Sequence, residues 1–203
     1  MTNFTRVILA LFCLQTTTGF AQDEASYKQQ PTLSIHFLLH DFKTAANIRN
    51  SSLSRVLTNK QFGKIKDMSP GLAISYSEGL SNNFDVAVTL AGSFLEYPRE
   101  NASSSSSGSD KFLLEADVSI RGKMLPDKYW FTPYLQVGVG ASKIEGYYGA
   151  FVPLGAGLQL NFFDEAFLMI NSQYRVPVTQ SASYHFYHSI GLAGNIGKKK
   201  SKD

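Results

Sequence analysis

The chain has very little cysteine and few charged residues. Its 203 residues include one cysteine, Cys13, which lies in an apolar run near the N-terminus. If that run is removed on export, the mature chain has no thiol, which excludes disulfides, cysteine nucleophiles and thiolate metal sites. Charged residues make up 17% of the chain, whereas about a quarter is usual in soluble domains. A low charge content is typical of proteins whose outer surface is not fully exposed to water.

Long apolar runs are also missing after the N-terminus. No segment there approaches the roughly 18 consecutive apolar residues that a membrane-spanning helix needs. The formal net charge is +3, and without Arg6 the chain carries 18 basic against 16 acidic side chains. This near balance argues against nucleic acid as a partner. The sequence therefore predicts neither a helical membrane protein nor a nucleic-acid-binding protein.

Residues 1–21 have the three parts of a secretory signal. Arg6 supplies the positive charge, residues 7–14 form the apolar segment, and small residues precede Gln22. We therefore expect cleavage after residue 21 and export, with residues 22–31 forming an N-terminal periplasmic segment. Residues 198–203, "KKKSKD", are expected to be a basic C-terminal tail.

What the chain does contain is aromatic residues at 13%, 16 glycines, and segments in which apolar and polar residues alternate. Strict alternation is the pattern of a strand with one apolar and one polar face. The sequence predicts eight such strands: 32–42, 71–79, 84–98, 111–122, 129–142, two strands between about 152 and 176, and 184–197. Within residues 157–176, for example, Leu158, Leu160, Leu168 and Ile170 share one face.

The links between these strands alternate in length. The first link, about residues 43–70, and the third, "RENASSSSSGSD", are long, and the fifth and seventh are of intermediate length. The second, fourth and sixth, "LSNN", "KMLPDK" and "FDE", are short. If the strands run up and down, all longer links lie at one end and all short turns at the other, as in outer-membrane barrels. We therefore predict an eight-stranded up-and-down antiparallel transmembrane β-barrel over residues 32–197.

The polar face of the strands is rich in small residues, which suits the narrow interior of an eight-stranded barrel. Charged residues on that face should pair there, because an unpaired buried charge is costly. We expect Arg121 to pair with Asp85, and Arg175 to reach Glu115 or Asp117. The predicted polar network of a narrow or plugged lumen comprises Asp85, Glu115, Asp117, Arg121, Gln136, Gln159, Asn161, Asn171, Gln173 and Arg175.

Two stretches, "DMSPGLAISYSEGLSNNFDVAVTLAGSFLEYP" and "GYYGAFVPLGAGLQLNFFDEAFLMINSQYRVPVT", resemble the transmembrane part of OmpA-like proteins of Bacteroidetes-type bacteria. The resemblance extends from about Thr32 to Gly197 and implies an eight-stranded outer-membrane barrel, but it names no active site. Many relatives continue into a periplasmic peptidoglycan-binding domain, which is not found after "GKKKSKD". A role in tethering the membrane to the cell wall is therefore not expected of this chain.

The sequence offers weak signals for chemistry. His188 and Ser189 are adjacent, so they point to opposite faces of a strand, which is poor geometry for a base and a nucleophile. His36 and His40 share the polar face of the first strand, but no matching ligand cluster is evident. We therefore expect no catalytic residues, no metal and no cofactor. Two alternatives stay open: a secreted soluble barrel binding a small apolar ligand, and an outer-membrane lipid-modifying enzyme.

The expected partners are outer-membrane lipids and lipopolysaccharide, with an extracellular partner contacted through the longer links. The first link is rich in basic residues and poor in acids, so it could bind the phosphates of lipopolysaccharide or another anionic partner. A solvated, mobile link is the simpler interpretation of the same composition. The basic residues of this link are Lys43, Arg49, Arg55, Lys60, Lys64 and Lys66.

Overall fold

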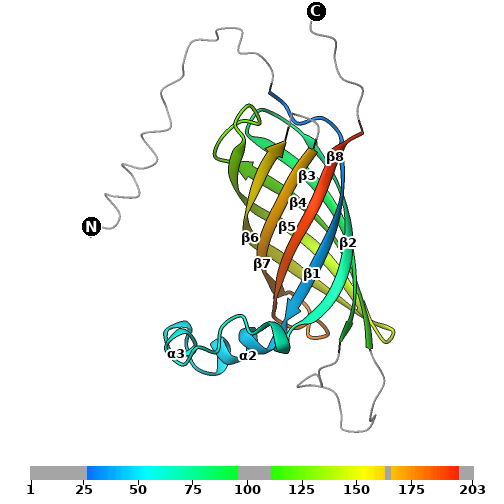
Figure 1. The fold of residues 1–203 in the computed structure, drawn as a ribbon. Helices are drawn as coiled ribbons and strands as arrows, with labels where there is room; N and C mark the ends of the chain where they lie inside the picture. Colours follow the sequence, from blue (N-terminus) through cyan, green and yellow to red (C-terminus); the bar gives the residue numbers. More distant parts are fainter. Residues whose placement is uncertain (1–26, 96–110, 163–165, 197–203) are drawn as a thin grey trace, which may run out of the picture.

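A computed structural model describes residues 27–95, 111–162 and 166–196. Eight antiparallel strands form one closed barrel in which each strand pairs with its neighbours along the chain (Figure 1). The strands are β1 (Thr32–Asp41), β2 (Ser69–Gly79), β3 (Phe84–Leu95), β4 (Lys111–Lys123), β5 (Phe131–Ile144), β6 (Tyr147–Phe162), β7 (Ala166–Pro177) and β8 (His185–Asn195). The predicted up-and-down eight-stranded barrel is confirmed.

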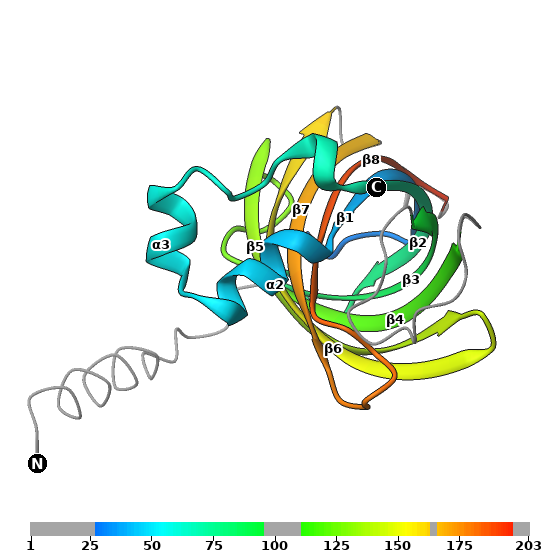
Figure 2. The ribbon, with the colours of Figure 1, turned by 90° about the horizontal axis from the view of Figure 1, so that it is seen from below.

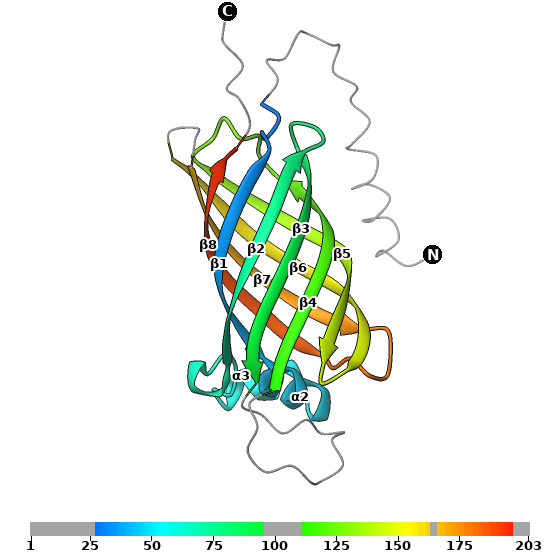
Figure 3. The same ribbon diagram turned by 90° about the vertical axis from the view of Figure 1, so that its right-hand side faces the viewer.

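The barrel closes because β1 pairs with β8 along its full length, from Thr32 opposite Asn195 to Asp41 opposite Phe186. Closure leaves no unpaired strand edge. With an even number of strands, the beginning of β1 and the end of β8 lie at the same end of the barrel (Figure 3). The predicted signal peptide, the serine-rich link, the "FDE" turn and the basic tail lie outside the described residues.

The alternation in sequence becomes a separation between outside and inside. Apolar side chains on the outer face of every strand are exposed, such as Ile35, Ile74, Leu135 and Leu192, the last with an exposed fraction of 71%. The residues between them point inward and are mostly polar or small, as in β3, where Asp85, Ala87, Thr89 and Ala91 are buried. The face assignment predicted for residues 157–176 is confirmed.

The link lengths differ from the prediction at two places. β5 and β6 are longer than expected and leave only Glu145 and Gly146 between them, both with positive φ (49° and 88°). Two consecutive residues with positive φ form the tight hairpin turn whose twist matches that of the strands. The fourth link, residues 124–130, is longer than this fifth link. The predicted alternation of link lengths is therefore wrong for these two links. Gly146 adopts a positive φ and so permits a two-residue turn where a longer link was predicted.

The first link is folded rather than a simple loop. It contains α2 (Phe42–Asn50), α3 (Leu53–Thr58) and the short 3-10 helix η1 (Ile65–Asp67). Asp41 begins α2 by accepting the Thr44 backbone N–H at 2.8 Å, which is the usual role of an aspartate at this position. Seen from that end, α2 lies over the barrel near β1 and β8 (Figure 2). No helix in the described ranges has the length and apolar character needed to cross a bilayer.

Candidate functional site

Arg175 on β7 is the centre of a charged cluster in the barrel interior, near the end covered by α2. Its side chain is fully buried, and its Nη2 lies 3.1 Å from Asp117 Oδ2 while its Nη1 bonds Glu115 Oε2. The guanidinium carbon also lies 4.0 Å from the ring centroid of Tyr187 and 4.8 Å from that of Phe151. One arginine thus joins β4 to β7 across the lumen and lies against two aromatic rings.

Two histidines complete this cluster on the side of β1 and β8. His40 Nε2 lies 2.9 Å from Glu115 Oε2, and His185 Nε2 lies 3.4 Å from Glu115 Oε1. The two imidazole rings are 5.1 Å apart in an edge-to-face arrangement. The expectation that His40 has no matching ligand cluster is wrong. The closure of the barrel brings His185 beside His40, and the register of β4 places Glu115 between them.

A second charged cluster lies at the opposite end of the interior. Lys123 Nζ is 3.0 Å from Asp85 Oδ1 and 2.7 Å from Asp127 Oδ2. Gln159 donates to Asp127 Oδ1 at 3.1 Å, and the Asn161 amide donates to the Asp127 carbonyl oxygen at 2.8 Å. Burial raises the pKa of the Asp127 carboxyl, and the positive charge of Lys123 opposes that shift. This cluster fastens the link between β4 and β5 to the barrel end.

The predicted pairing of Arg121 with Asp85 is wrong. The two residues are backbone partners in the β3–β4 ladder, but Asp85 is engaged by Lys123 instead. The Arg121 guanidinium carbon lies 5.5 Å from the Tyr134 ring centroid, and its Nη1 is 3.9 Å from the Met169 sulfur. Its Nε has no hydrogen-bond partner in the described part of the chain. β4 extends to Lys123, one residue beyond the predicted end, which brings that lysine into the lumen.

The remaining predicted lumen residues bond side chains two strands away or on the same strand. Asn171 donates to Gln136 Oε1 at 3.0 Å, and Arg175 Nε donates to Gln173 Oε1 at 3.4 Å. Every member of the predicted network is buried except Asn161, which is half-buried at the barrel end. The first cluster includes Glu115, Asp117, Gln173 and Arg175, and the second includes Asp85, Gln159 and Asn161. Arg121 and the Asn171–Gln136 pair lie outside both, so the predicted residues do not form one continuous network. The predicted network missed four members of these clusters: Lys123, Asp127, His40 and His185. Strand parity could have added the two histidines, because it places both on the inner face.

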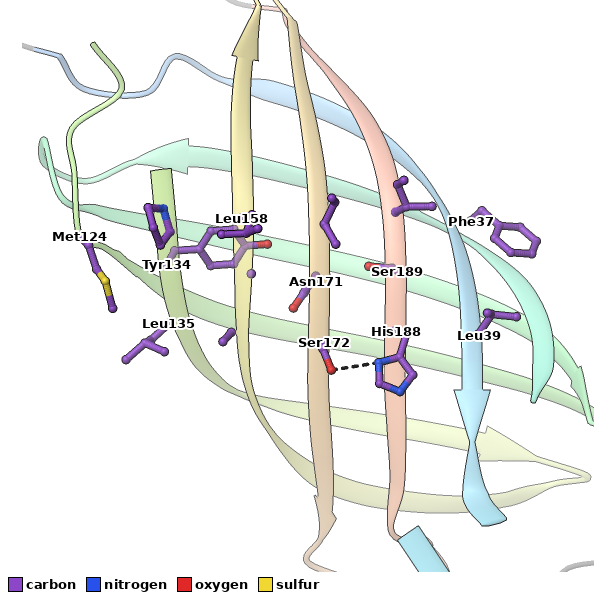
Figure 4. Close-up of a pocket in the computed structure, with 15 residues that line it drawn as sticks. Phe37, Leu39, Met124, Tyr134, Leu135, Leu158, Asn171, Ser172, His188 and Ser189 are labelled. Carbon is purple, nitrogen blue, oxygen red and sulfur yellow. Dashed lines mark hydrogen bonds between the residues drawn. The ribbon is translucent and has the colours of Figure 1, made fainter. Parts of the chain in front are cut away.

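The outer wall carries an apolar groove of about 550 Å³ across β5 to β8 and β1 (Figure 4). In this groove Ser172 Oγ lies 2.9 Å from His188 Nδ1. The two residues are direct partners in the β7–β8 ladder and both face outward. His188 and Ser189 do point to opposite faces, as expected, and the serine that meets His188 comes from the neighbouring strand.

A serine hydroxyl bonded to an imidazole is the core of many ester hydrolases. Acyl transfer further needs N–H donors aimed at the oxygen that becomes negative. Ser172 lies inside a regular ladder, between Ala156 and His188, where backbone N–H groups serve strand pairing. The geometry is better explained as two polar side chains that satisfy each other on an apolar surface.

The six basic residues of the first link are all exposed on the helical segment. Lys43 lies 3.0 Å from Asp67, which ties α2 to η1. The Arg49 guanidinium lies 4.1 Å from the Tyr184 ring centroid, which connects α2 to the link before β8. The first link is therefore folded and not a simple solvated loop. It presents Arg55, Lys60, Lys64 and Lys66 outward.

No protein family model and no curated protein sequence matches this chain. Among solved structures it is similar to the outer membrane protein OprG from Pseudomonas aeruginosa, with a TM-score of 0.56 and 10% identity over 83% of this chain and 97% of that chain. It is also similar to Neisserial surface protein A (NspA), with a TM-score of 0.50 and 11% identity over 86% of this chain and 100% of that chain. At such identities the likeness shows a shared fold, so membership of the OmpA-like family stays a prediction.

Proposed function

We propose that this chain is an integral protein of a bacterial outer membrane, with a structural or interaction role and a narrow or plugged lumen. The observation that supports this proposal is the polarity of the barrel, which is the reverse of that of a soluble protein. Its outer face is apolar on all eight strands, while its buried interior holds the charged clusters. In a transmembrane barrel, outward residues meet lipid and inward residues are polar. A soluble barrel that binds a small apolar ligand would have the opposite arrangement.

The proposed orientation follows from the links. The α2 end carries the helical first link and the residues joining β7 to β8, and both described chain ends lie at the other end (Figure 1). Outer-membrane barrels keep their longer links outside the cell and their termini in the periplasm. The α2 end would therefore be extracellular, where its exposed basic residues could meet lipopolysaccharide phosphates or an anionic partner.

The lumen leaves little room for a pore. Arg175, Phe151, Tyr187 and Tyr134 are among the largest fully buried side chains, and all four point into the barrel. An eight-stranded barrel has an interior that side chains can just fill. We therefore expect little or no conductance, and no role as a general diffusion channel.

Membrane fractionation and electrical recording test this proposal together. The protein is expected in the outer-membrane fraction, and its unheated form should migrate differently from the boiled form on a denaturing gel. Planar-bilayer recordings should show small or no steady currents. Recovery as a soluble monomer would refute the membrane location, whereas a large steady pore would refute only the plugged lumen.

A further inference from the structure

Three buried ligand atoms converge at the α2 end of the lumen. They are His40 Nε2, His185 Nε2 and Glu115 Oε1. The two histidine nitrogens lie 2.9 and 3.4 Å from the Glu115 carboxylate oxygens, but none of the three atoms makes an aligned hydrogen bond in the described chain. Their residues have exposed fractions of 1%, 4% and 1%, and one ligand atom from each lies within 4.8 Å of the others. A buried polar atom without a partner is costly. Three such atoms facing one another point to a missing species between them.

The contacts of the second ring nitrogens indicate what that species is. His185 Nδ1 lies 2.9 Å from the backbone carbonyl oxygen of Ser183, and a carbonyl can only accept, so Nδ1 must carry the proton. In the neutral ring, Nε2 then directs a lone pair at Glu115 Oε1, 3.4 Å away. His40 Nδ1 lies 2.8 Å from the Ser93 hydroxyl, which can accept in the same way. Lone pairs that face each other at this distance repel, and either a second proton on the ring or a cation between the ligand atoms removes that repulsion.

We propose that His40, His185 and Glu115 bind a divalent transition-metal ion of the zinc class. Metal-bound histidines usually donate their other N–H to a carbonyl, carboxylate or similar acceptor, as both rings can here. Two imidazoles and one carboxylate are the protein ligands of zinc sites that keep an open position. Bonds of about 2.0–2.2 Å in tetrahedral geometry separate ligand atoms by about 3.4 Å, which is the separation between His185 Nε2 and Glu115 Oε1.

The surrounding charges permit a cation there. Arg175 occupies Glu115 Oε2 and Asp117 Oδ2, so Oε1 stays available as a ligand. The Arg175 charge is offset by Asp117, which leaves the Glu115 carboxylate to neutralise one of the two positive charges of the metal. Imidazole nitrogens favour zinc, nickel, copper or iron over calcium and magnesium, which prefer oxygen ligands.

An ion can reach this site from the α2 end. A cavity of about 550 Å³ lies there and includes Glu115 and His185 in its lining. Phe42 of α2 stacks on the His185 ring at 4.5 Å, so the helical link forms one wall of the cavity. The open coordination position would face this cavity, which suits exchange of the metal or of a small ligand on it.

The test uses the folded, tag-free chain in detergent, titrated with Zn²⁺ in competition with a chromophoric chelator. We expect one Zn²⁺ per chain, and His185→Ala and His40→Ala should each abolish binding. His36→Ala is the matched control, because His36 is also buried on β1 and bonds Ser34 at 2.8 Å, away from the cluster. Ser93→Ala should weaken binding about 10-fold, as expected for loss of a partner that orients a ligand.

Substitution with Co²⁺ gives a readout that needs no variant. A visible absorption band of a low-coordinate site with nitrogen ligands should appear in the unaltered protein, and Ca²⁺ or Mg²⁺ should not displace it. Absence of both the band and Zn²⁺ binding would overturn the proposal. Equal Zn²⁺ affinity in His185→Ala, His40→Ala and His36→Ala would overturn it too, since binding would then lie elsewhere. The result is independent of the proposed membrane location.

Discussion

Replacing Ile170 with arginine tests whether the outer face of the barrel meets lipid. Ile170 lies on β7 with an exposed fraction of 41%, and its ladder partners Leu158 and Ile190 are apolar and also face outward. If this belt lies in hydrocarbon, the guanidinium must leave water when the barrel inserts. An arginine on the lipid face costs about 2–4 kcal/mol near the bilayer midplane.

The depth of the substitution supplies the matched control. Phe162 is the last residue of β6 and is also exposed, at 46%, but it lies at the end of the barrel. The same arginine substitution there should cost only about 0–1 kcal/mol, because near the interface the side chain can reach water. The difference between the two sites therefore isolates depth in the membrane from the intrinsic effect of arginine in a strand.

The assay is equilibrium folding into phospholipid vesicles as a function of urea, with the free energy of unfolding measured for each variant. In a soluble barrel, Ile170→Arg would place a charge in water at little cost. Equal free energies for Ile170→Arg and Phe162→Arg, or no loss in either, would refute the assignment of the apolar face to lipid.

Two further predictions concern the polar groups. Arg175→Met should destabilise folding by about 3–5 kcal/mol, because it leaves Glu115 and Asp117 buried without their counter-charge. Adding Glu115→Gln and Asp117→Asn should recover part of that loss in the same urea assay, and a triple variant as unstable as the single one would contradict the charge explanation. Ser172→Ala should leave the acyl-chain composition of cellular lipids unchanged, as measured by mass spectrometry, because the Ser172–His188 pair lacks oxyanion donors. A loss of deacylated lipids in that variant would instead establish an enzyme.

The strand pattern predicted the faces of residues 157–176 but not the turn between β5 and β6 or the helices of the first link. The alternation of Leu158, Leu160, Leu168 and Ile170 showed that these residues share one face, because side chains in a strand alternate between two faces whatever their neighbours are. The turn at Glu145 and Gly146 escaped prediction because residues 143–150 were assigned to a link, whereas all of them except these two belong to β5 or β6. For the helices α2 and α3, the sequence offered only a short amphipathic piece within residues 44–58, since each helix is short and depends for its stability on burial of Ala45 and Val56.

The sequence by itself determined the strands and which residues share a face, because these depend on the local two-residue period. The small residues of the polar face and the pattern of link lengths indicated that this face turns inward. The sequence did not determine which inward side chains meet. Arg175 and Glu115 were paired in advance because few opposite charges share the interior. Barrel closure and strand register decided that Asp85 pairs with Lys123 and not with Arg121. They also decided that His40 and His185 lie together beside Glu115. Those contacts join residues distant in the chain, and a one-residue change in the register or extent of a strand exchanges one partner for another.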